Sequence, residues 1–290
     1  MSARPLDARR AATGKSPLRA RGVLPLAILV VASLCALVPL AFMVLTAFKT
    51  QRQYLADTYG LPWPLTLSNF ADAVHGGELF TWLKNSAIYT LGSVVMSTAC
   101  AVLCAFAIAR MRFRGQNLLL SVNVALMVVP PVVMLIPLFA QFSDLDLVGT
   151  YRGVIAIYAG LTMPFSIYLL TSFFRTLPGE LFDAALVDGA SHVRVLRTVV
   201  LPLAAPALVT LVVVNSLWVW NELLIALVFL PADDKKSLMV GLTTVLQGRF
   251  SLNVPVLMAG MVLASTPMLM LYFAGQRFFV RGLTAGALKG

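Results

Sequence analysis

Long apolar runs separated by short polar stretches dominate the pattern of hydrophobic and polar positions in this chain. A helix needs about 20 mainly apolar residues to cross a hydrocarbon core about 30 Å thick. No part of the pattern requires strands. The sequence therefore predicts an all-α polytopic membrane protein with six transmembrane helices, at residues 23–48, 86–109, 118–143, 153–174, 203–230 and 254–279.

The first apolar run follows a basic segment, so a cleaved signal peptide is an alternative to a first membrane span. A signal peptide has an apolar core of about 7–15 residues and a small-residue cleavage site. The run at 23–48 is longer than such a core and has no convincing cleavage site. We interpret it as an uncleaved span that follows a basic tail at residues 1–22, whose role the sequence does not indicate.

Two of the predicted spans carry packing signals. In the span at 86–109, small residues recur every four positions, a spacing that lets membrane helices approach closely, so we expect this span inside the bundle. These residues are Ser93, Ser97, Ala101, Ala105 and Ala109. In the span at 118–143, prolines remove backbone donors and predict a kink, which is either structural or part of a water-filled pathway. They are Pro130, Pro131 and Pro137.

The amino-acid composition supports a membrane protein. Hydrophobic residues make up 59% of the chain and charged residues only 12%, with a mean hydropathy of +0.88. Soluble domains are about half apolar and about a quarter charged. A water-soluble globule is therefore excluded, and the lack of low-complexity tracts and of charged heptads also excludes disordered and coiled-coil chains.

The basic residues predict the orientation of the spans. Fifteen of the 22 Lys and Arg share the side of both termini, and this side is the cytoplasm because cytoplasmic loops carry the excess of positive charge. The net charge of +10 then reflects topology and attraction to anionic membrane lipid, and we expect no nucleic-acid partner. The other seven are Lys49, Arg52, Lys84, Arg152, Lys235, Lys236 and Arg249.

No catalytic or metal-binding cluster is recognisable in the sequence. The two histidines, His75 and His192, are predicted on opposite sides of the membrane. Three cysteines lie within predicted spans, where we interpret them as small packing residues. Gly14-Lys15-Ser16 matches the end of a phosphate-binding loop, but Arg9 occupies the position of that motif's first glycine. We therefore expect no catalytic residue, no metal and no cofactor on this chain.

The fifth predicted span contains an acidic residue, Glu222. A charge at that depth costs on the order of 2.5 to 3.5 kcal/mol, so Glu222 must face a partner or water. On a helix Asn215, Trp218 and Glu222 share one face, while Trp220 points the opposite way. Two interpretations are open for a candidate set that excludes Trp220: the residues line a hydrated translocation pathway, or they form a hydrogen-bonded helix contact. The set is Asn215, Trp218, Asn221 and Glu222. With so few ionisable groups in the spans, we expect no coupling to ions.

The connection at residues 175–202 is the longest predicted cytoplasmic segment between spans, and its pattern is helical. Pro178 and Glu180 suit the first turn of a helix, one by its fixed φ and the other by its charge. Gly189 interrupts the pattern, and apolar residues then resume at helical spacing as far as Pro202. We expect a helix, a glycine turn and a second amphipathic helix, which together form a hairpin suited to a protein cleft.

The motif Asp183-Ala184-Ala185, followed by Gly189 and by Val199-Val200-Leu201-Pro202, resembles the Glu-Ala-Ala loop of ATP-binding-cassette (ABC) importer permeases. Asp183 stands where this family mostly has Glu, and Val199 where it usually has Ile. The resemblance implies that the hairpin contains the coupling helix that docks in a cleft of an ATPase subunit. It assigns ATPase coupling to Asp183, Ala184, Ala185, Gly189, Leu201 and Pro202.

Other segments resemble the shorter, second permease of maltose-type carbohydrate importers. They are Phe48-Lys49-Thr50, Leu67-Ser68-Asn69-Phe70, Asn85-Ser86, Trp220-Asn221-Glu222 and residues 281–290. The last of these resembles a terminal peptide that inserts between paired ATPase subunits, and the alternative is a frayed tail. Within a cytoplasmic tail at residues 280–290, the resemblance implies ATPase contact for Gly282, Leu283, Thr284, Gly286, Lys289 and Gly290.

The resemblance also implies the architecture, partners and location of the chain. Residues 23–279 would form a non-catalytic type I ABC importer permease domain in a bacterial or archaeal plasma (inner) membrane. Its partners would be a second homologous permease, two copies of an ATPase subunit that carry ATP and Mg, and an extracytoplasmic sugar-binding protein. The alternatives are an importer for another solute, such as a polyamine or glycerol phosphate, and a stand-alone carrier or channel.

Overall fold

The computed structural model describes residues 18–75, 77–250 and 252–287, and all regular structure in these ranges is helical. Four of the described helices are long and apolar enough to cross a membrane. They are α1 (Leu18–Ala47), α4 (Glu78–Arg110), α7 (Tyr151–Thr176) and α15 (Val254–Ala287). Two bent helix pairs also qualify, and if each pair counts as one span the total is the predicted six.

The bends of these pairs lie next to prolines. α5 (Gln116–Leu126) and α6 (Pro131–Asp144) meet at 99°, which confirms the kink predicted for this span. Pro130 between them has extended backbone (φ −65°, ψ 133°), so the helix cannot continue through it. The second pair, residues His192–Leu203 and α11 (Ala205–Trp220), meets at 77°.

The predicted fifth span is not one continuous helix. α11 ends at Trp220 and the chain becomes helical again as α12 (Leu224–Phe229). A continuous helix over 203–230 is therefore wrong, and the interruption contains Asn221 and Glu222.

The shorter helices cap the two ends of the molecule and connect the spans. They are α2 (Gln51–Ala56), α3 (Ser68–Val74), α8 (Gly179–Val187), α9 (His192–Val195), α10 (Leu201–Leu203), α13 (Leu238–Val240) and α14 (Gln247–Arg249). Segments of π- or 3₁₀-helix are η1 (Leu196–Val200), η2 (Asp233–Lys235) and η3 (Gly241–Leu246).

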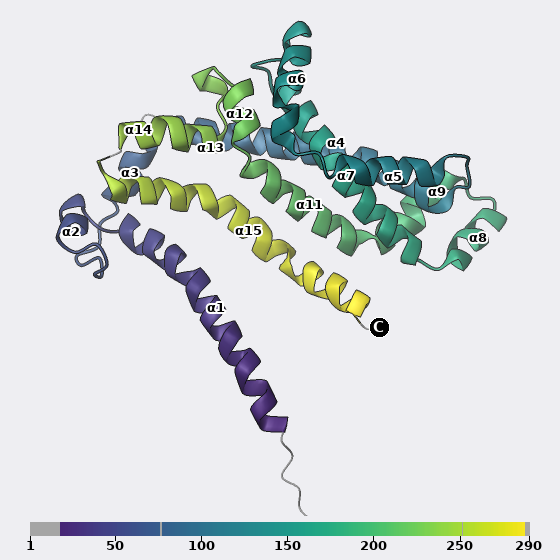
Figure 1. Cartoon of the computed structure of the whole chain (residues 1–290), viewed down its shortest axis with the longest axis horizontal. Coiled ribbons are helices and arrows are strands. Elements are labelled where there is room, and N and C mark those ends of the chain that lie inside the picture. The colour runs from purple at the N-terminus through teal and green to yellow at the C-terminus, as the bar shows by residue number, and fades with distance from the viewer. Residues whose placement is uncertain (1–17, 76, 251, 288–290) are drawn as a thin grey trace, which may run out of the picture.

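The long helices form a bundle whose two ends carry different short elements (Figure 1). α4, α7, α11 and α15 run along the long axis, with α2 and α3 near one end and α8 at the other. The C-terminal end of α1 contacts α15, whereas the N-terminal end of α1 diverges from the bundle. No residue in the most apolar window of α1 is buried, so this helix offers its surface to lipid or to another subunit.

α4 and α7 form the most extensive helix pair of the described structure. Ser93, Ser97, Ala101 and Ala105 of α4 are fully buried, which confirms that the small-residue face lies inside the bundle. The predicted packing role of the cysteines is wrong for this chain alone. Their side chains, Cys35, Cys100 and Cys104, are exposed.

At the end of the bundle where α1 finishes, two of the sequence segments that carry the family resemblance meet. The side-chain amide of Asn69 donates to the carbonyls of Ala47 (2.8 Å) and Lys49 (2.7 Å). Lys49 is only 2% exposed, and its ammonium donates to the carbonyls of Asp57 (3.0 Å) and Thr58 (2.8 Å). A buried ammonium needs such acceptors. The hydrogen bonds of Asn69 and Lys49 therefore hold the connection between α1 and α3 in its fold.

Candidate functional site

The hairpin at residues 175–202 has the helix, glycine turn and second helix that the sequence predicts. α8 follows Pro178 and carries Glu180 in its first turn, where a negative charge opposes the helix dipole. α9 begins after Ser191, whose hydroxyl accepts a hydrogen bond from the amide of Arg194 at 3.4 Å. The two helices are thus bounded by local capping interactions.

Gly189 terminates α8 in a left-handed conformation (φ 80°), which glycine adopts without steric cost. The amide of Gly189 donates to the carbonyl of Leu186 and the amide of Ala190 to that of Ala185, each at 3.0 Å. This is the Schellman pairing of a glycine-terminated helix. A Cβ at Gly189 would meet no other described atom within 4 Å. Within this chain, glycine is therefore required for its backbone conformation.

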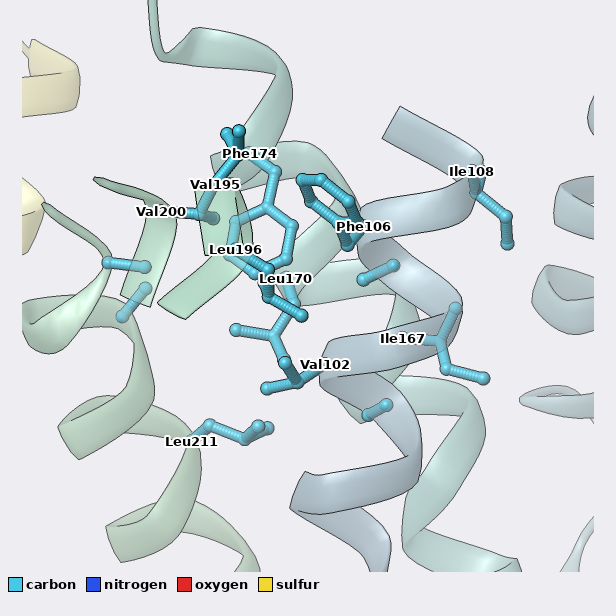
Figure 2. Packing of buried hydrophobic residues seen from close by; sticks show 14 of the residues in the cluster. Val102, Phe106, Ile108, Ile167, Leu170, Phe174, Val195, Leu196, Val200 and Leu211 are labelled. Atoms are coloured by element: carbon cyan, nitrogen blue, oxygen red, sulfur yellow. The ribbon is translucent and has the colours of Figure 1, made fainter. Parts of the chain in front are cut away.

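One face of the hairpin is buried against the ends of the spans, in an apolar cluster that also contains residues of α4, α7 and α11 (Figure 2). Since interiors are packed closely, this shared core attaches the hairpin to the spans. The hairpin contributes Phe182, Val195, Leu196 and Val200, and the spans contribute Val102, Phe106, Leu170, Phe174 and Leu211.

The opposite face of the hairpin presents the Glu-Ala-Ala-type motif. Asp183 and Ala184 are exposed and Ala185 is half-buried. Of the other residues predicted to couple, Leu201 is half-buried and Pro202 is exposed. Small side chains on a short, anchored helix allow a close approach by another protein.

In the interruption after α11, the carboxylate of Glu222 takes the place of missing helical hydrogen bonds. It accepts from the amides of Ile225 (3.0 and 3.1 Å) and Ala226 (3.1 Å), two of the unpaired donors in the first turn of α12. It also accepts from the hydroxyl of Tyr158 on α7 at 2.8 Å. Glu222 therefore has the partner that its depth requires, and it connects α12 to α7.

Asn215 lies inside the bundle. It is 2% exposed, and its side-chain amide donates to the hydroxyl of Ser166 at 2.9 Å. That hydroxyl donates to the carbonyl of Thr162 (2.7 Å) and lies 3.3 Å from the hydroxyl of Ser97. For Asn215, this geometry favours the second interpretation of the shared polar face, a hydrogen-bonded contact among α4, α7 and α11, over a pathway lining.

Trp218 and Asn221 are more accessible. Trp218 is 37% exposed and meets the ring of Tyr158 edge-on, with 6.0 Å between the ring centroids. Asn221 is exposed and its amide donates to the carbonyl of Leu217 at 2.7 Å, which leaves its side-chain oxygen free to accept. Trp220 points the other way, as predicted, and its indole donates to the carbonyl of Ala264 at 3.2 Å.

Two cavities meet at Trp218. One, of about 450 Å³, is lined by Trp218, Asn221 and Glu222 together with the broken region around Pro130 and Pro131. The other, of about 490 Å³, is mainly apolar and lies among α5, α6 and α7. Three of the four candidate pathway residues thus share one cavity. The break between α5 and α6 and the break between α11 and α12 both border it.

Sequence reasoning missed Tyr158. Glu222 was expected to need a partner, but Tyr158 lies 64 residues away in another span, so spacing does not reveal the pair. The available signal was a tyrosine within an apolar span, because its hydroxyl needs a hydrogen-bond partner when buried.

No group of three or more potential metal ligands occurs in the part of the chain that the structure describes.

The two ends of the chain are described only in part. α15 continues through Ala287, so the backbone at Gly282, Leu283, Thr284 and Gly286 is helical. Lys289, Gly290 and residues 1–17 lie outside the described residues. ATPase contact by the C-terminal segment and the role of the N-terminal tail stay predictions.

Known proteins resemble this chain along most of its length. A family model described as "Binding-protein-dependent transport system inner membrane component" matches residues 97–285. The alpha-glucoside transport system permease protein AglG of Rhizobium meliloti is 36% identical over 83% of this chain and 64% of its own length. The arabinooligosaccharides transport system permease protein AraQ of Halalkalibacterium halodurans is 31% identical over 88% of this chain and 92% of its own.

A solved structure shares the fold. One chain of a bacterial ABC transporter involved in the import of the acidic polysaccharide alginate superposes with a TM-score of 0.78 at 26% identity. The match covers 91% of this chain and 98% of that one. The chain therefore belongs to the family of binding-protein-dependent transport system inner membrane components, and it is a multi-pass, non-catalytic permease of an ABC importer.

Proposed function

We propose that this chain forms half of the translocation pathway of an ATP-driven sugar importer and is coupled to an ATPase subunit through the hairpin at residues 175–202. The observation that carries the proposal is the two-faced hairpin. Its inner face belongs to the apolar core of the spans, while the motif around Ala184 is exposed. Closure of the ATPase subunits would pull this rigid element and tilt the spans, as in alternating access.

A sugar is the proposed cargo because of the chemistry around Trp218 and the names of the relatives. An indole ring offers an apolar face to a pyranose, and the side-chain oxygen of the nearby Asn221 can accept a hydrogen bond from a sugar hydroxyl. AglG is named for α-glucosides and AraQ for arabino-oligosaccharides. A polyamine would instead call for several carboxylates, and the described lining of this cavity has one.

The proposal includes partners and an orientation. A second permease would cover the exposed apolar surface and complete the pathway, two ATPase subunits would carry ATP and Mg, and an extracytoplasmic binding protein would deliver the sugar. Both termini and the hairpin would lie in the cytoplasm, since fifteen of the 22 Lys and Arg share that side.

Co-purification tests the coupling part of the proposal. The chain is expressed with its partner permease and the ATPase, and the ATPase retained in detergent is measured for the unchanged chain and for Ala184→Trp. We expect retention by the unchanged chain and loss with Ala184→Trp, because a large side chain would block close docking. Retention by both chains would contradict docking at α8, and uptake without any ATPase would indicate a stand-alone carrier.

A ligand screen tests the cargo. The purified binding protein is heated with mono- and oligosaccharides, polyamines or glycerol phosphate, and its unfolding midpoint is recorded. A ligand that binds only the folded state raises the midpoint. Stabilisation by a sugar alone is expected, whereas stabilisation by a polyamine or glycerol phosphate would overturn the sugar assignment.

A further inference from the structure

Arg110, the last residue of α4, links three elements at the cytoplasmic end of the bundle. Its guanidinium Nη2 donates to the carbonyl of Phe174 and, at 2.6 Å, to the carbonyl of Leu177. The same guanidinium lies over the ring of Phe182, 3.8 Å from its centroid. α4 is thereby connected to the C-terminal end of α7 and to the coupling helix α8 through one side chain.

The chemistry of arginine suits this position. The carbonyls at the end of a helix lack partners within that helix, and cations near a helix C-terminus interact favourably with its dipole. A guanidinium is planar, so it can donate in its plane to α7 while its face stacks on Phe182. A lysine ammonium has the charge but no plane to stack.

Packing alone does not account for Arg110. Its Nε is buried and has no hydrogen-bond partner among the described residues, a situation that costs free energy. Beside it lies a cavity of about 370 Å³ that also borders Asp183 and His192, so the contact region is not filled by side chains. The guanidinium leaves one donor unsatisfied and part of the space empty, so its connections to α7 and α8, rather than space filling, account for its position.

We propose that Arg110 is a positioning residue for energy coupling: it holds the coupling helix in a fixed orientation relative to α4 and α7, so that movement of the hairpin is transmitted to the spans. This inference rests on the proposed function, in which the hairpin docks on an ATPase. Without Arg110 the hairpin keeps its apolar anchor through Phe182, Val195 and Leu196. It remains folded and attached but pivots against the spans.

The experiment measures how strongly the outer side of the complex controls ATP hydrolysis. The full complex of permeases and ATPase is reconstituted in lipid, and the ATP hydrolysis rate is measured with and without the extracytoplasmic binding protein. Arg110→Gln is compared with Arg114→Gln, which removes one positive charge from an exposed position on the same side. ATPase content and thermal midpoint are recorded for each complex, and Arg110→Lys tests whether the charge is sufficient.

Arg110→Gln is expected to reduce stimulation by the binding protein on the order of 10-fold, the size of a typical coupling between distant sites. ATPase content should stay at the level of the unchanged chain, and Arg110→Lys should give an intermediate value. Equal stimulation in Arg110→Gln and Arg114→Gln would overturn the inference. So would a loss of stimulation that only follows a loss of bound ATPase, because that result indicates a purely structural role.

A second variant keeps the inference testable if Arg110→Gln does not assemble. Phe182→Leu preserves an apolar side chain in the cluster but removes the ring beneath the guanidinium, so it should lower stimulation by a smaller factor. Normal stimulation in Phe182→Leu would then count against the inference. If the unchanged chain itself retains no ATPase, docking at the hairpin fails, and that outcome is distinct from failure of the role of Arg110.

Discussion

Two of the interruptions between helices, the hairpin around Gly189 and the break after Trp220, use their polar residues in opposite ways. At the hairpin around Gly189, apolar residues face the bundle, whereas Asp183 and Ala184 are exposed. At the break after Trp220, the carboxylate of Glu222 turns inward to the amides of α12 and to Tyr158. The first interruption leaves Asp183 and Ala184 exposed, whereas the second satisfies its most polar group within the chain.

This difference follows from the surroundings. Asp183 is exposed, so water can solvate its carboxylate. At membrane depth an unpaired carboxylate is costly, and internal hydrogen bonds replace water. Glu222 is therefore held by groups of its own chain, whereas Trp218 and Asn221 are accessible at the cavity, where the proposed function has them meet the solute.

The largest expected effect comes from Gly189→Asp, which alters the outward-facing interruption. We expect normal membrane insertion but loss of uptake, because an added side chain at the turn would wedge against a docked ATPase. Uptake and membrane content are measured in cells. The matched control is Gly115→Asp, since Gly115 also has a positive φ (90°) and no described atom within 4 Å of a Cβ. Uptake lost equally in both variants would attribute the effect to backbone strain.

The next effect concerns the inward-facing interruption. Glu222→Gln replaces one of the two accepting carboxylate oxygens with an NH2 group, which cannot accept from the amides of Ile225 and Ala226 or from the hydroxyl of Tyr158. The loss should cost about 1–3 kcal/mol. Thermal unfolding of the purified chain is the measurement. Glu78→Gln, which removes an exposed ion pair to Arg249, should change stability by about 0–1 kcal/mol. A Glu222→Gln chain with unchanged stability would contradict the inward-facing description.

Trp218→Ala tests the accessible part of the second interruption, because Trp218 lines the cavity there but makes none of the hydrogen bonds that Glu222 makes. Loss of an aromatic contact of about 0.5–1.5 kcal/mol should raise the KM of uptake, by roughly tenfold at most. Trp218→Phe keeps an aromatic face and should resemble the unchanged chain. The KM is measured with the sugar that stabilises the binding protein. Equal KM values for Trp218→Ala and Trp218→Phe would remove Trp218 from the pathway.

The smallest effect is predicted for Asn215→Ala. Its hydrogen bond to Ser166 lies within the bundle, and such bonds between membrane helices contribute about 0.6 kcal/mol on average. A slight decrease in the unfolding midpoint and an unchanged KM are expected. A clear rise in KM would instead place Asn215 on the pathway.

Much of the fold could be predicted from local properties. Span positions follow from apolar length, the buried face of α4 from its small residues, and the bend between α5 and α6 from Pro130 and Pro131. The ends of helices were less accessible to prediction. α4 begins at Glu78 rather than near 86, because helical hydrogen bonding continues beyond the apolar run into polar residues.

The details of the candidate site depend on tertiary contacts that periodicity does not encode. Hydropathy gives no sign of the break after Trp220, because both sides of it are apolar and the interrupting Glu222 resembles a polar residue on a continuous helix. The connection from Arg110 to Phe174 and Phe182 likewise joins residues more than 60 positions apart. The hairpin was predictable because Gly189 and its capping residues act locally.

The proposed function depends on docking of the exposed face of α8 on an ATPase. This docking is tested most directly by cross-linking from Ala184→Cys in a chain whose Cys35, Cys100 and Cys104 are replaced by Ser, with the fully assembled complex in native membranes. A short bifunctional thiol reagent should give an adduct with the combined mass of this chain and the ATPase. Leu55→Cys, 72% exposed near the opposite end of the bundle, should give none. No adduct from Ala184→Cys, or an equal yield from Leu55→Cys, would contradict the account.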